Sequence, residues 1–294
     1  MTLLVGWAAL DRKGAGYDIS SIHFATDSRF TYYYNEKPYQ KQDFHRKVYG
    51  CLKSPNIFAF CGDANCPTFL IKSIVKESDA CGLLSNSKEC HEKFSIVKDF
   101  FSDRINCYNN SIVQDFTIYH ATRTDRKEER RTMHYFHVYK YSVNKESMII
   151  TAEEIALPKN NSDVFCIDGS GKDIFMQRWQ TEYGPGNNNY RTSRAVYQCL
   201  CETLASSAIE TVGTIPQIMG LIRINNSIQY GTIIEDKLYT IYEDGIKLIE
   251  DESEISIDSI KWWRNENYEI ANPYTRKRKI GAQSQPLHIR EATP

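Results

Sequence analysis

The most constraining feature of the sequence is its beginning. Thr2 is followed by the apolar run Leu3–Leu10, and a second apolar run covers Ile19–Thr26. Between the two runs, Asp11–Gly16 is rich in charge and glycine, which is typical of a turn between antiparallel strands. The sequence therefore predicts a buried N-terminal strand that holds Thr2 rigidly at one end of a sheet.

Thr2 has the chemistry of a nucleophile if Met1 is removed. The residue then carries a hydroxyl and a free α-amine on adjacent carbons. A hydroxyl needs a base to take its proton, and an α-amine titrates at roughly 7.7–8.0. Thr is small enough for the processing aminopeptidase to accept behind Met, so removal is expected. Because Thr is also an ordinary second residue, an edge strand without catalytic chemistry is the alternative interpretation.

Composition narrows the classes of function. The chain has 294 residues and a net charge of −1, so no global field favours nucleic acid or an anionic membrane. Charged residues end the first apolar run early, and we expect neither a signal peptide nor a membrane span. The nine cysteines are an odd number without regular spacing, which favours reduced thiols. We therefore expect a cytoplasmic protein with no metal and no cofactor.

Several polar residues stand at predicted strand ends. Asp27 follows the second strand, where it pairs with a neighbouring cation or caps the turn. Lys47 belongs to an isolated basic pair, and spacing alone favours a solvated side chain. Gly62 closes the strand Asn56–Cys61, where a glycine allows close backbone approach to a ligand or simply makes a turn. The polar segment Tyr32–Gln42 is expected to be a loop.

Helical periodicity appears in two pairs of segments, and the composition changes near residue 245. The expected helices are Pro67–Lys76, Lys88–Ile105, a segment ending near Gln180, and Thr192–Ala208. Consecutive helices after several strands predict a helical layer on a sheet. The composition divides the chain into a domain at 2–244 and a C-terminal extension at 245–294. This extension is expected to be partly disordered and to pack through its two tryptophans.

The order of these motifs resembles the proteasome β-subunit group of N-terminal nucleophile (Ntn) hydrolases, in a divergent bacterial-type form. The resemblance covers roughly residues 2–242. Each motif is short, but together they occupy corresponding strand ends in the same order. The matching residues are Thr2, Gly6, Asp27-Ser28-Arg29, Lys47, Gly62-Asp63, Gly169-Ser170-Gly171, Thr211-Val212-Gly213 and Pro216-Gln217.

The resemblance implies an α+β fold, a four-layer αββα sandwich, and a role for each of five residues. Thr2 is the implied nucleophile. Lys47 is expected beside its hydroxyl, where a positive charge lowers the pKa of the hydroxyl and the amine, and Asp27 is expected to fix Lys47. The N–H of Gly62 is the implied oxyanion donor. Ser170 is expected to orient the amine, directly or through water.

One position departs from the pattern of the family. There an Asp, followed shortly by a Ser, supports the catalytic amine after the last long helix. This chain has Ile209-Glu210-Thr211-Val212-Gly213 at that place. Either Glu210 substitutes for the Asp, or the contact is absent.

The preferred hypothesis is a threonine-type amidohydrolase, a peptidase that transfers an acyl group to Thr2 after Met1 is removed. Peptide or protein substrates and a homo-oligomer are the implied partners, without nucleic acid or membrane. A second hypothesis keeps the Ntn chemistry and changes the substrate to a small-molecule amide. A third is a non-catalytic proteasome-like subunit for assembly or regulation, which has no need of Thr2, Asp27 and Lys47 together.

Overall fold

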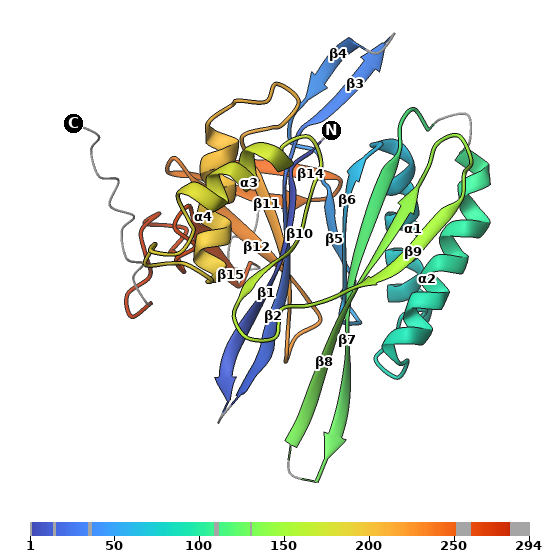
Figure 1. Cartoon of the computed structure of the whole chain (residues 1–294), viewed down its shortest axis with the longest axis horizontal. Coiled ribbons are helices and arrows are strands. Elements are labelled where there is room, and N and C mark those ends of the chain that lie inside the picture. Colours follow the sequence, from blue (N-terminus) through green and yellow to red (C-terminus); the bar gives the residue numbers. More distant parts are fainter. Residues whose placement is uncertain are drawn as a thin grey trace.

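The protein is built mainly of antiparallel β-sheet (Figure 1). The computed structural model describes residues 2–13, 16–34, 37–108, 112–129, 131–250 and 260–282. Strands account for 42% of the structure and helices for 23%, so strand pairing dominates the architecture. The strands form three sheets, of eight, five and two strands.

The eight-stranded sheet contains the N-terminal strands. Its order is β10-β1-β2-β11-β12-β13-β14, and β15 pairs with β12 as the one parallel strand among those described. Leu4 of β1 pairs with Thr26 of β2, so Thr2 and Asp27 lie beside each other at the same end of these two strands. The strands are β1 (Leu4–Lys13), β2 (Gly16–Asp27), β10 (Asp163–Asp168), β11 (Pro216–Ile222), β12 (Ser227–Ile234), β13 (Lys237–Tyr242), β14 (Gly245–Ile249) and β15 (Trp262–Asn265).

The five-stranded sheet and a separate two-stranded ribbon complete the β structure. The five-stranded sheet is antiparallel, with its strands in chain order: β5 (Val48–Gly50), β6 (Asn56–Gly62), β7 (Phe116–Glu128), β8 (Arg131–Val143) and β9 (Ile150–Ile155). The ribbon pairs β3 (Phe30–Tyr34) with β4 (Lys37–Gln42) and projects from the body of the molecule (Figure 1).

The helices pack against the two larger sheets. Helices α1 (Asn65–Cys81) and α2 (Cys90–Ile105) share an apolar cluster with β6, β7 and β8, and the short 3-10 helix η1 (Asn106–Tyr108) follows α2. Helices α3 (Lys172–Thr181) and α4 (Ser193–Ala205) pack on β1 and β11. Local sequence sets two helix ends: Glu89 and Glu92 form a capping box before α2, and Gly82 ends α1 with φ +71°.

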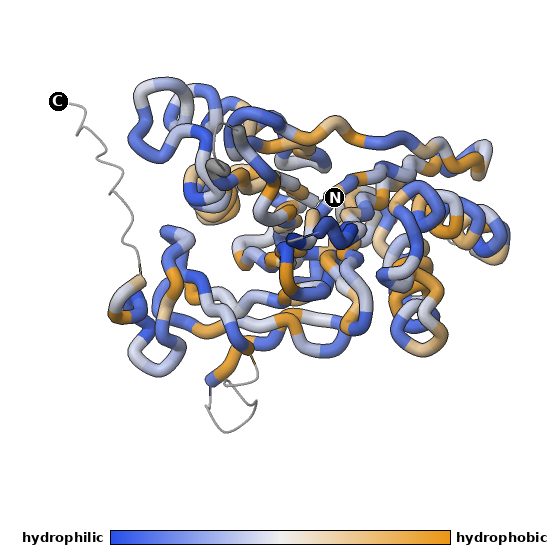
Figure 2. The backbone as a smooth tube through the Cα atoms, turned by 90° about the horizontal axis from the view of Figure 1, so that it is seen from below, coloured by the Kyte–Doolittle hydropathy of each residue, from blue (hydrophilic) through white to orange (hydrophobic). Residues whose placement is uncertain are grey.

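A third apolar cluster joins the two larger sheets. Leu4, Phe24 and Met219 from the eight-stranded sheet pack with Ala59 and Tyr119 from the five-stranded sheet. Burial of a leucine, phenylalanine or methionine side chain in such a cluster stabilises the fold by roughly 1.5–3 kcal/mol. Figure 2 shows hydrophobic residues interspersed with hydrophilic ones along the chain. Among the described residues, no helix is both long enough and apolar enough to cross a membrane.

The predicted fold class, an α+β four-layer αββα sandwich, is wrong. The structure is mostly antiparallel sheet, divided among several sheets. One cause is the segment Tyr32–Gln42, expected to be a loop, where β3 and β4 pair with each other. Another is the region after residue 244, where β14 and β15 add strands to the eight-stranded sheet. A strand is recognised by the strand that it pairs with, and the residue pattern within these segments did not indicate that pairing.

The proposed domain boundary at residue 244 lies between two paired strands. Strand β14 pairs with β13, and Trp263 in β15 is 3% exposed and packs over Gly231. The extension was expected to be partly disordered. Part of it, residues 251–259 and 283–294, lies outside the described residues. The division into 2–244 and 245–294 stays a prediction.

Candidate active site

Thr2 is held at the start of β1 by the end of β2. The N–H of Leu3 donates to Oδ1 of Asp27 at 3.0 Å, and the N–H of Asp27 donates to the carbonyl of Leu3 at 3.3 Å. Thr2 itself is 2% exposed. These bonds extend the β1–β2 pairing past its last paired residues, so the backbone fixes the direction of the Thr2 side chain.

The buried side chain of Lys47 joins Thr2 to Asp27. Its Nζ lies 2.8 Å from Oγ1 of Thr2 and 2.9 Å from Oδ1 of Asp27. The side chains of Lys47 and Asp27 are 1% and 0% exposed. Two further backbone N–H groups, those of Arg29 and Gly213, donate to Oδ2 of Asp27 at 2.9 and 2.8 Å. The carboxylate is thus fully hydrogen-bonded, as a buried charge must be.

Burial governs the electrostatics of this group. It lowers the pKa of Lys47, and the charge of Asp27 with its hydrogen bond opposes that effect. The ring of Phe30 lies beside the ammonium, with its centroid 5.8 Å from Nζ. A desolvated lysine gives up its proton more readily than an exposed one. Lys47 can therefore donate to the Thr2 oxygen and can also exchange a proton with it.

The segment after β10 surrounds the backbone of Thr2. The N–H of Gly171 donates to the Thr2 carbonyl at 3.3 Å, and the Ser170 hydroxyl reaches the same oxygen at 3.5 Å. Gly169 has φ +90°, and a Cβ at this position would lie 2.1 Å from the Thr2 carbonyl oxygen. Glycine is required there both by the backbone conformation and by the space.

Gly62 is the last residue of β6, a strand whose backbone is hydrogen-bonded to Lys47. The N–H of Phe60, two residues earlier, donates to the Lys47 carbonyl at 3.3 Å. Gly62 has φ +98°, and an added Cβ would lie 2.2 Å from the carbonyl oxygen of Asp115. Among the described residues, no hydrogen bond joins Gly62 to Thr2. Its role as an oxyanion donor stays a prediction.

Glu210 lies away from the Thr2 hydroxyl. Its side chain is 71% exposed and forms an ion pair with Lys41. The next residue, Thr211, is buried, and its Oγ1 lies 3.2 Å from Oγ of Ser170. The family pattern pointed to Glu210 because it has a carboxylate at this place, whereas the structure presents a hydroxyl. The only available signal for Thr211 was its place in the turn at 209–213.

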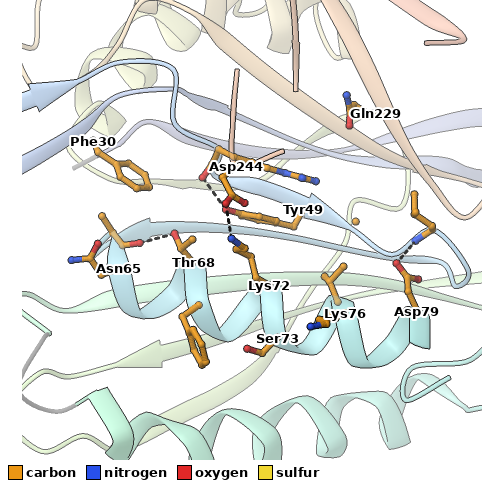
Figure 3. A pocket seen from close by; sticks show the side chains of 16 residues that line it. Phe30, Tyr49, Asn65, Thr68, Lys72, Ser73, Lys76, Asp79, Gln229 and Asp244 are labelled. Carbon is orange, nitrogen blue, oxygen red and sulfur yellow. Dashed lines mark hydrogen bonds and ion pairs between the residues drawn. The ribbon is translucent and has the colours of Figure 1, made fainter. Parts of the chain in front are cut away.

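A cavity of about 710 Å³ lies beside helix α1 and strand β5, and Thr2, Asp27 and Lys47 are not among the residues that line it (Figure 3). It shares Phe30 with the surroundings of Lys47, and Arg46 also lines it. Lys72 reaches from α1 to Asp244 in the turn before β14, at 2.7 Å. The apolar wall of the cavity consists of Phe30, Tyr49, Ala64, Phe69 and Val75. A group of moderate size with apolar surface fits this space.

Within the described ranges, no group of three or more His, Cys, Asp or Glu side chains is arranged to hold a metal ion. All nine cysteines are free thiols, and burial raises the pKa of Cys61, which lies next to Gly62 in sequence. The expectation of a reaction without metal or cofactor stays a prediction.

Comparisons with known proteins show only a distant likeness. No family model matches the sequence, and no curated protein matches it. Solved structures that are similar in part include Anbu proteins from two organisms. Anbu (ancestral beta-subunit) from Yersinia bercovieri is 12% identical, with a TM-score of 0.47 over 77% of this chain and 86% of that one. The Anbu (Gly-1) mutant from Hyphomicrobium sp. strain MC1 is 10% identical, with a TM-score of 0.43 over 78% and 86%.

These values correct the family assignment. The sequence motifs identified the chain as a bacterial-type member of the proteasome β-subunit group, and that assignment is wrong, because only a distant relationship is supported. Each motif spans one to three residues at a strand end, and such short matches do not establish a family. The likeness to Anbu supports no statement about activity, so the site must be judged on its own geometry.

Proposed function

We propose that the chain is an N-terminal threonine amidohydrolase that cleaves peptide bonds. The observation that carries this proposal is the 2.8 Å contact between Lys47 Nζ and Thr2 Oγ1, buried beside Asp27. A hydroxyl at this distance from a desolvated ammonium has a lowered pKa and is prepared for nucleophilic attack.

The reaction requires cleavage of the bond between Met1 and Thr2. The freed α-amine takes the proton of Oγ1 as the oxygen attacks the substrate carbonyl, and a C–O bond forms. The amine then gives that proton to the departing nitrogen as the C–N bond breaks. This leaves an ester on Thr2, and a water activated by the same amine hydrolyses it to a carboxylic acid.

The surrounding residues have separate tasks in this scheme. The Lys47 ammonium stabilises negative charge on Oγ1, and Asp27 keeps Lys47 in place. The N–H of Gly62 is assigned to the oxyanion, a contact worth on the order of 3 kcal/mol. Ser170 orients the amine through its hydroxyl. The cavity beside Phe30 takes a side chain from the acyl part of the substrate.

The proposal includes a homo-oligomer in the cytoplasm. Several large apolar side chains are exposed in the single chain, among them Leu52 at 79% and Ile224 at 81%. Contact with a second copy covers such surface favourably. Light scattering that shows only a 34.0 kDa species across micromolar concentrations contradicts this part of the proposal.

The central test combines the intact mass of the purified protein with its rate of peptide-amide hydrolysis. We expect the purified protein to lack Met1 and to hydrolyse a panel of peptide amides, and Thr2→Ala to abolish turnover with little change in the unfolding midpoint. Thr2→Ser keeps partial activity, because it retains the hydroxyl and the amine. Full retention of Met1 in an active preparation rules out the mechanism. Hydrolysis of small-molecule amides alone rules out the peptidase assignment and keeps the chemistry.

A further inference from the structure

Gln217 is a buried polar residue without an assigned task. It lies on β11, opposite Thr26 of β2, and is 1% exposed. Burying an amide is unfavourable unless its donors and acceptor are satisfied. An apolar side chain is the ordinary occupant of an interior strand position. The hydrogen bonds of Gln217 therefore indicate why a polar side chain stands there.

The amide of Gln217 makes four hydrogen bonds, all to backbone groups. Its Oε1 accepts from the N–H of Lys47 at 2.8 Å and from the N–H of Val48 at 3.3 Å. Its Nε2 donates to the carbonyls of Asp27 at 3.0 Å and His45 at 2.8 Å. Both amide hydrogens and both acceptor positions are used. Because the partners are N–H groups on one side and carbonyl groups on the other, they also determine which side-chain atom is the oxygen and which is the nitrogen.

These four bonds join segments from two different sheets. Asp27 ends β2 in the eight-stranded sheet, whereas Lys47 precedes β5 in the five-stranded sheet. Between them the chain leaves the core to form the β3–β4 ribbon. The chain between Asp27 and Lys47 is therefore long, and it does not by itself fix their separation. Gln217 contacts the backbone of both residues.

Other contacts hold the segment before Lys47 but do not reach both residues. The N–H of His45 donates to the carbonyl of Ser28 at 2.8 Å, and the N–H of Ile246 donates to the carbonyl of Phe44 at 2.7 Å. The side-chain ion pair joins Asp27 to Lys47, but it depends on where the two backbones lie. The amide of Gln217 bonds directly to both backbones.

We propose that Gln217 is a positioning residue that sets the Lys47 ammonium at bonding distance from both Thr2 and Asp27. It touches no substrate and acts through the backbones of Asp27 and Lys47. The inference rests on the proposed function for its kinetic consequence, but not for its geometric one. A loss of this alignment by about 1 Å costs on the order of 100-fold in rate when the reacting groups are otherwise present.

The test compares two buried glutamines. Gln217→Met keeps the length of the side chain and removes all four hydrogen bonds. Gln198→Met is the matched control, because Gln198 is also buried and bonded, to Asn189 and Asn267, and neither of these bonds reaches Thr2, Asp27 or Lys47. We expect Gln217→Met to lower kcat by at least about tenfold with KM within about twofold. Gln198→Met keeps both constants.

A second readout does not depend on turnover. The pKa of Lys47 is followed by NMR in protein with labelled lysine, with the signal assigned from Lys47→Arg. We expect Gln217→Met to raise this pKa toward its ordinary value, because water reaches the freed N–H groups, while Gln198→Met leaves it unchanged. If the pKa is unaltered or falls in Gln217→Met, the positioning role is overturned.

The two readouts separate the two proposals. If Thr2→Ala hydrolyses peptide amides at the wild-type rate, the proposed function fails, and the titration of Lys47 still decides the role of Gln217. If Thr2 is required but Gln217→Met changes neither kcat nor the pKa of Lys47, the function stands and Gln217 serves stability alone.

Discussion

The hydroxyl oxygens of Ser170 and Thr211 lie 3.2 Å apart, and the same Ser170 oxygen lies 3.5 Å from the carbonyl oxygen of Thr2. One hydroxyl thus contacts the backbone of the proposed nucleophile and a second hydroxyl from the turn after α4. The neighbouring Glu210, which the sequence offered as a support for the amine, forms an ion pair with Lys41 instead.

Removal of the Thr211 hydroxyl is expected to weaken the orientation of Ser170. Thr211→Val keeps the shape of the side chain and removes its hydroxyl, so we expect kcat to fall by about tenfold or more with KM nearly unchanged. Thr211→Ser keeps the hydroxyl and most of the activity. Steady-state kinetics of both variants check this. Equal activity of the Val and Ser variants contradicts the assignment.

Lys47 and Lys93 make a matched pair of buried lysines. Lys93 is 0% exposed and bonds to the Arg123 carbonyl at 3.0 Å, and burial lowers the pKa of both lysines. Lys47→Met is expected to lower the rate by several orders of magnitude, because the charge beside Thr2 is lost. Lys93→Met keeps the rate. Activity per folded protein, corrected by circular dichroism, is the measurement.

Two glycines with positive φ offer a steric test of the segment around Thr2. A Cβ on Gly169 would lie 2.1 Å from the Thr2 carbonyl oxygen, whereas Gly186, with φ +108°, has nothing within 4 Å. Both Ala variants carry backbone strain, so both should lose stability. We expect loss of activity only from Gly169→Ala, because only that change displaces Thr2. Parallel loss of activity in both variants refutes the explanation.

An uncleaved N-terminal tag is expected to abolish activity without unfolding the protein. It converts the α-amine of Thr2 to an amide, which accepts no proton at neutral pH, and it occupies the approach to the hydroxyl. The same tag after Pro294 is tolerated. Intact mass must accompany the assay, since removal of the tag restores the amine. A protein that keeps its N-terminal tag and the full rate does not use Thr2.

Two buried histidines predict a loss of stability in acid. Burial lowers the pKa of His23 to about 3, with a further contribution from Arg264, and burial with Lys93 lowers the pKa of His120 well below its ordinary value. Below about pH 6.5 the unfolded chain binds protons that the folded protein does not. Stability therefore falls as the pH falls from 6.5, by about 2 kcal/mol per histidine at pH 5.

Denaturant unfolding at pH 7 and pH 5 measures this effect. His120→Gln and His23→Gln should each reduce the loss between the two pH values by about 2 kcal/mol. His91→Gln is the control, because His91 is exposed. If both buried-site variants keep the pH dependence of the wild-type protein, the two histidines are not the source of the acid sensitivity.

The sequence was most informative where a pattern is local. The apolar runs around β1 and β2 and the periodicity of α2 indicated those elements, and residues at the strand ends indicated Thr2, Asp27 and Lys47. The structure brings these three within hydrogen-bonding distance, although their catalytic roles stay predictions. Spacing alone had favoured a solvated Lys47, since burial depends on contacts between distant segments.

The remaining features depend on such distant contacts. The strands β14 and β15 are recognised only by the strands that they pair with. Thr211 contributes one hydroxyl contact and Gln217 four hydrogen bonds, all to residues far away in sequence. Both residues stand in short motifs that carried the family resemblance. A lone polar residue in a turn or a strand has no periodic signal, however, so the local sequence did not show which groups their side chains bind.

The position of β11 has a consequence for the order in which the protein becomes active. The N–H of Gly213 donates a hydrogen bond to the Asp27 carboxylate, and Gln217 binds the backbone of Lys47 before β5. A ribosome that has made Thr2, Asp27 and Lys47 has not yet made these partners. During synthesis the nascent chain therefore carries its proposed nucleophile without the surroundings that activate it. On the proposed mechanism, the site is therefore complete only after the strand that follows α4 has emerged and docked.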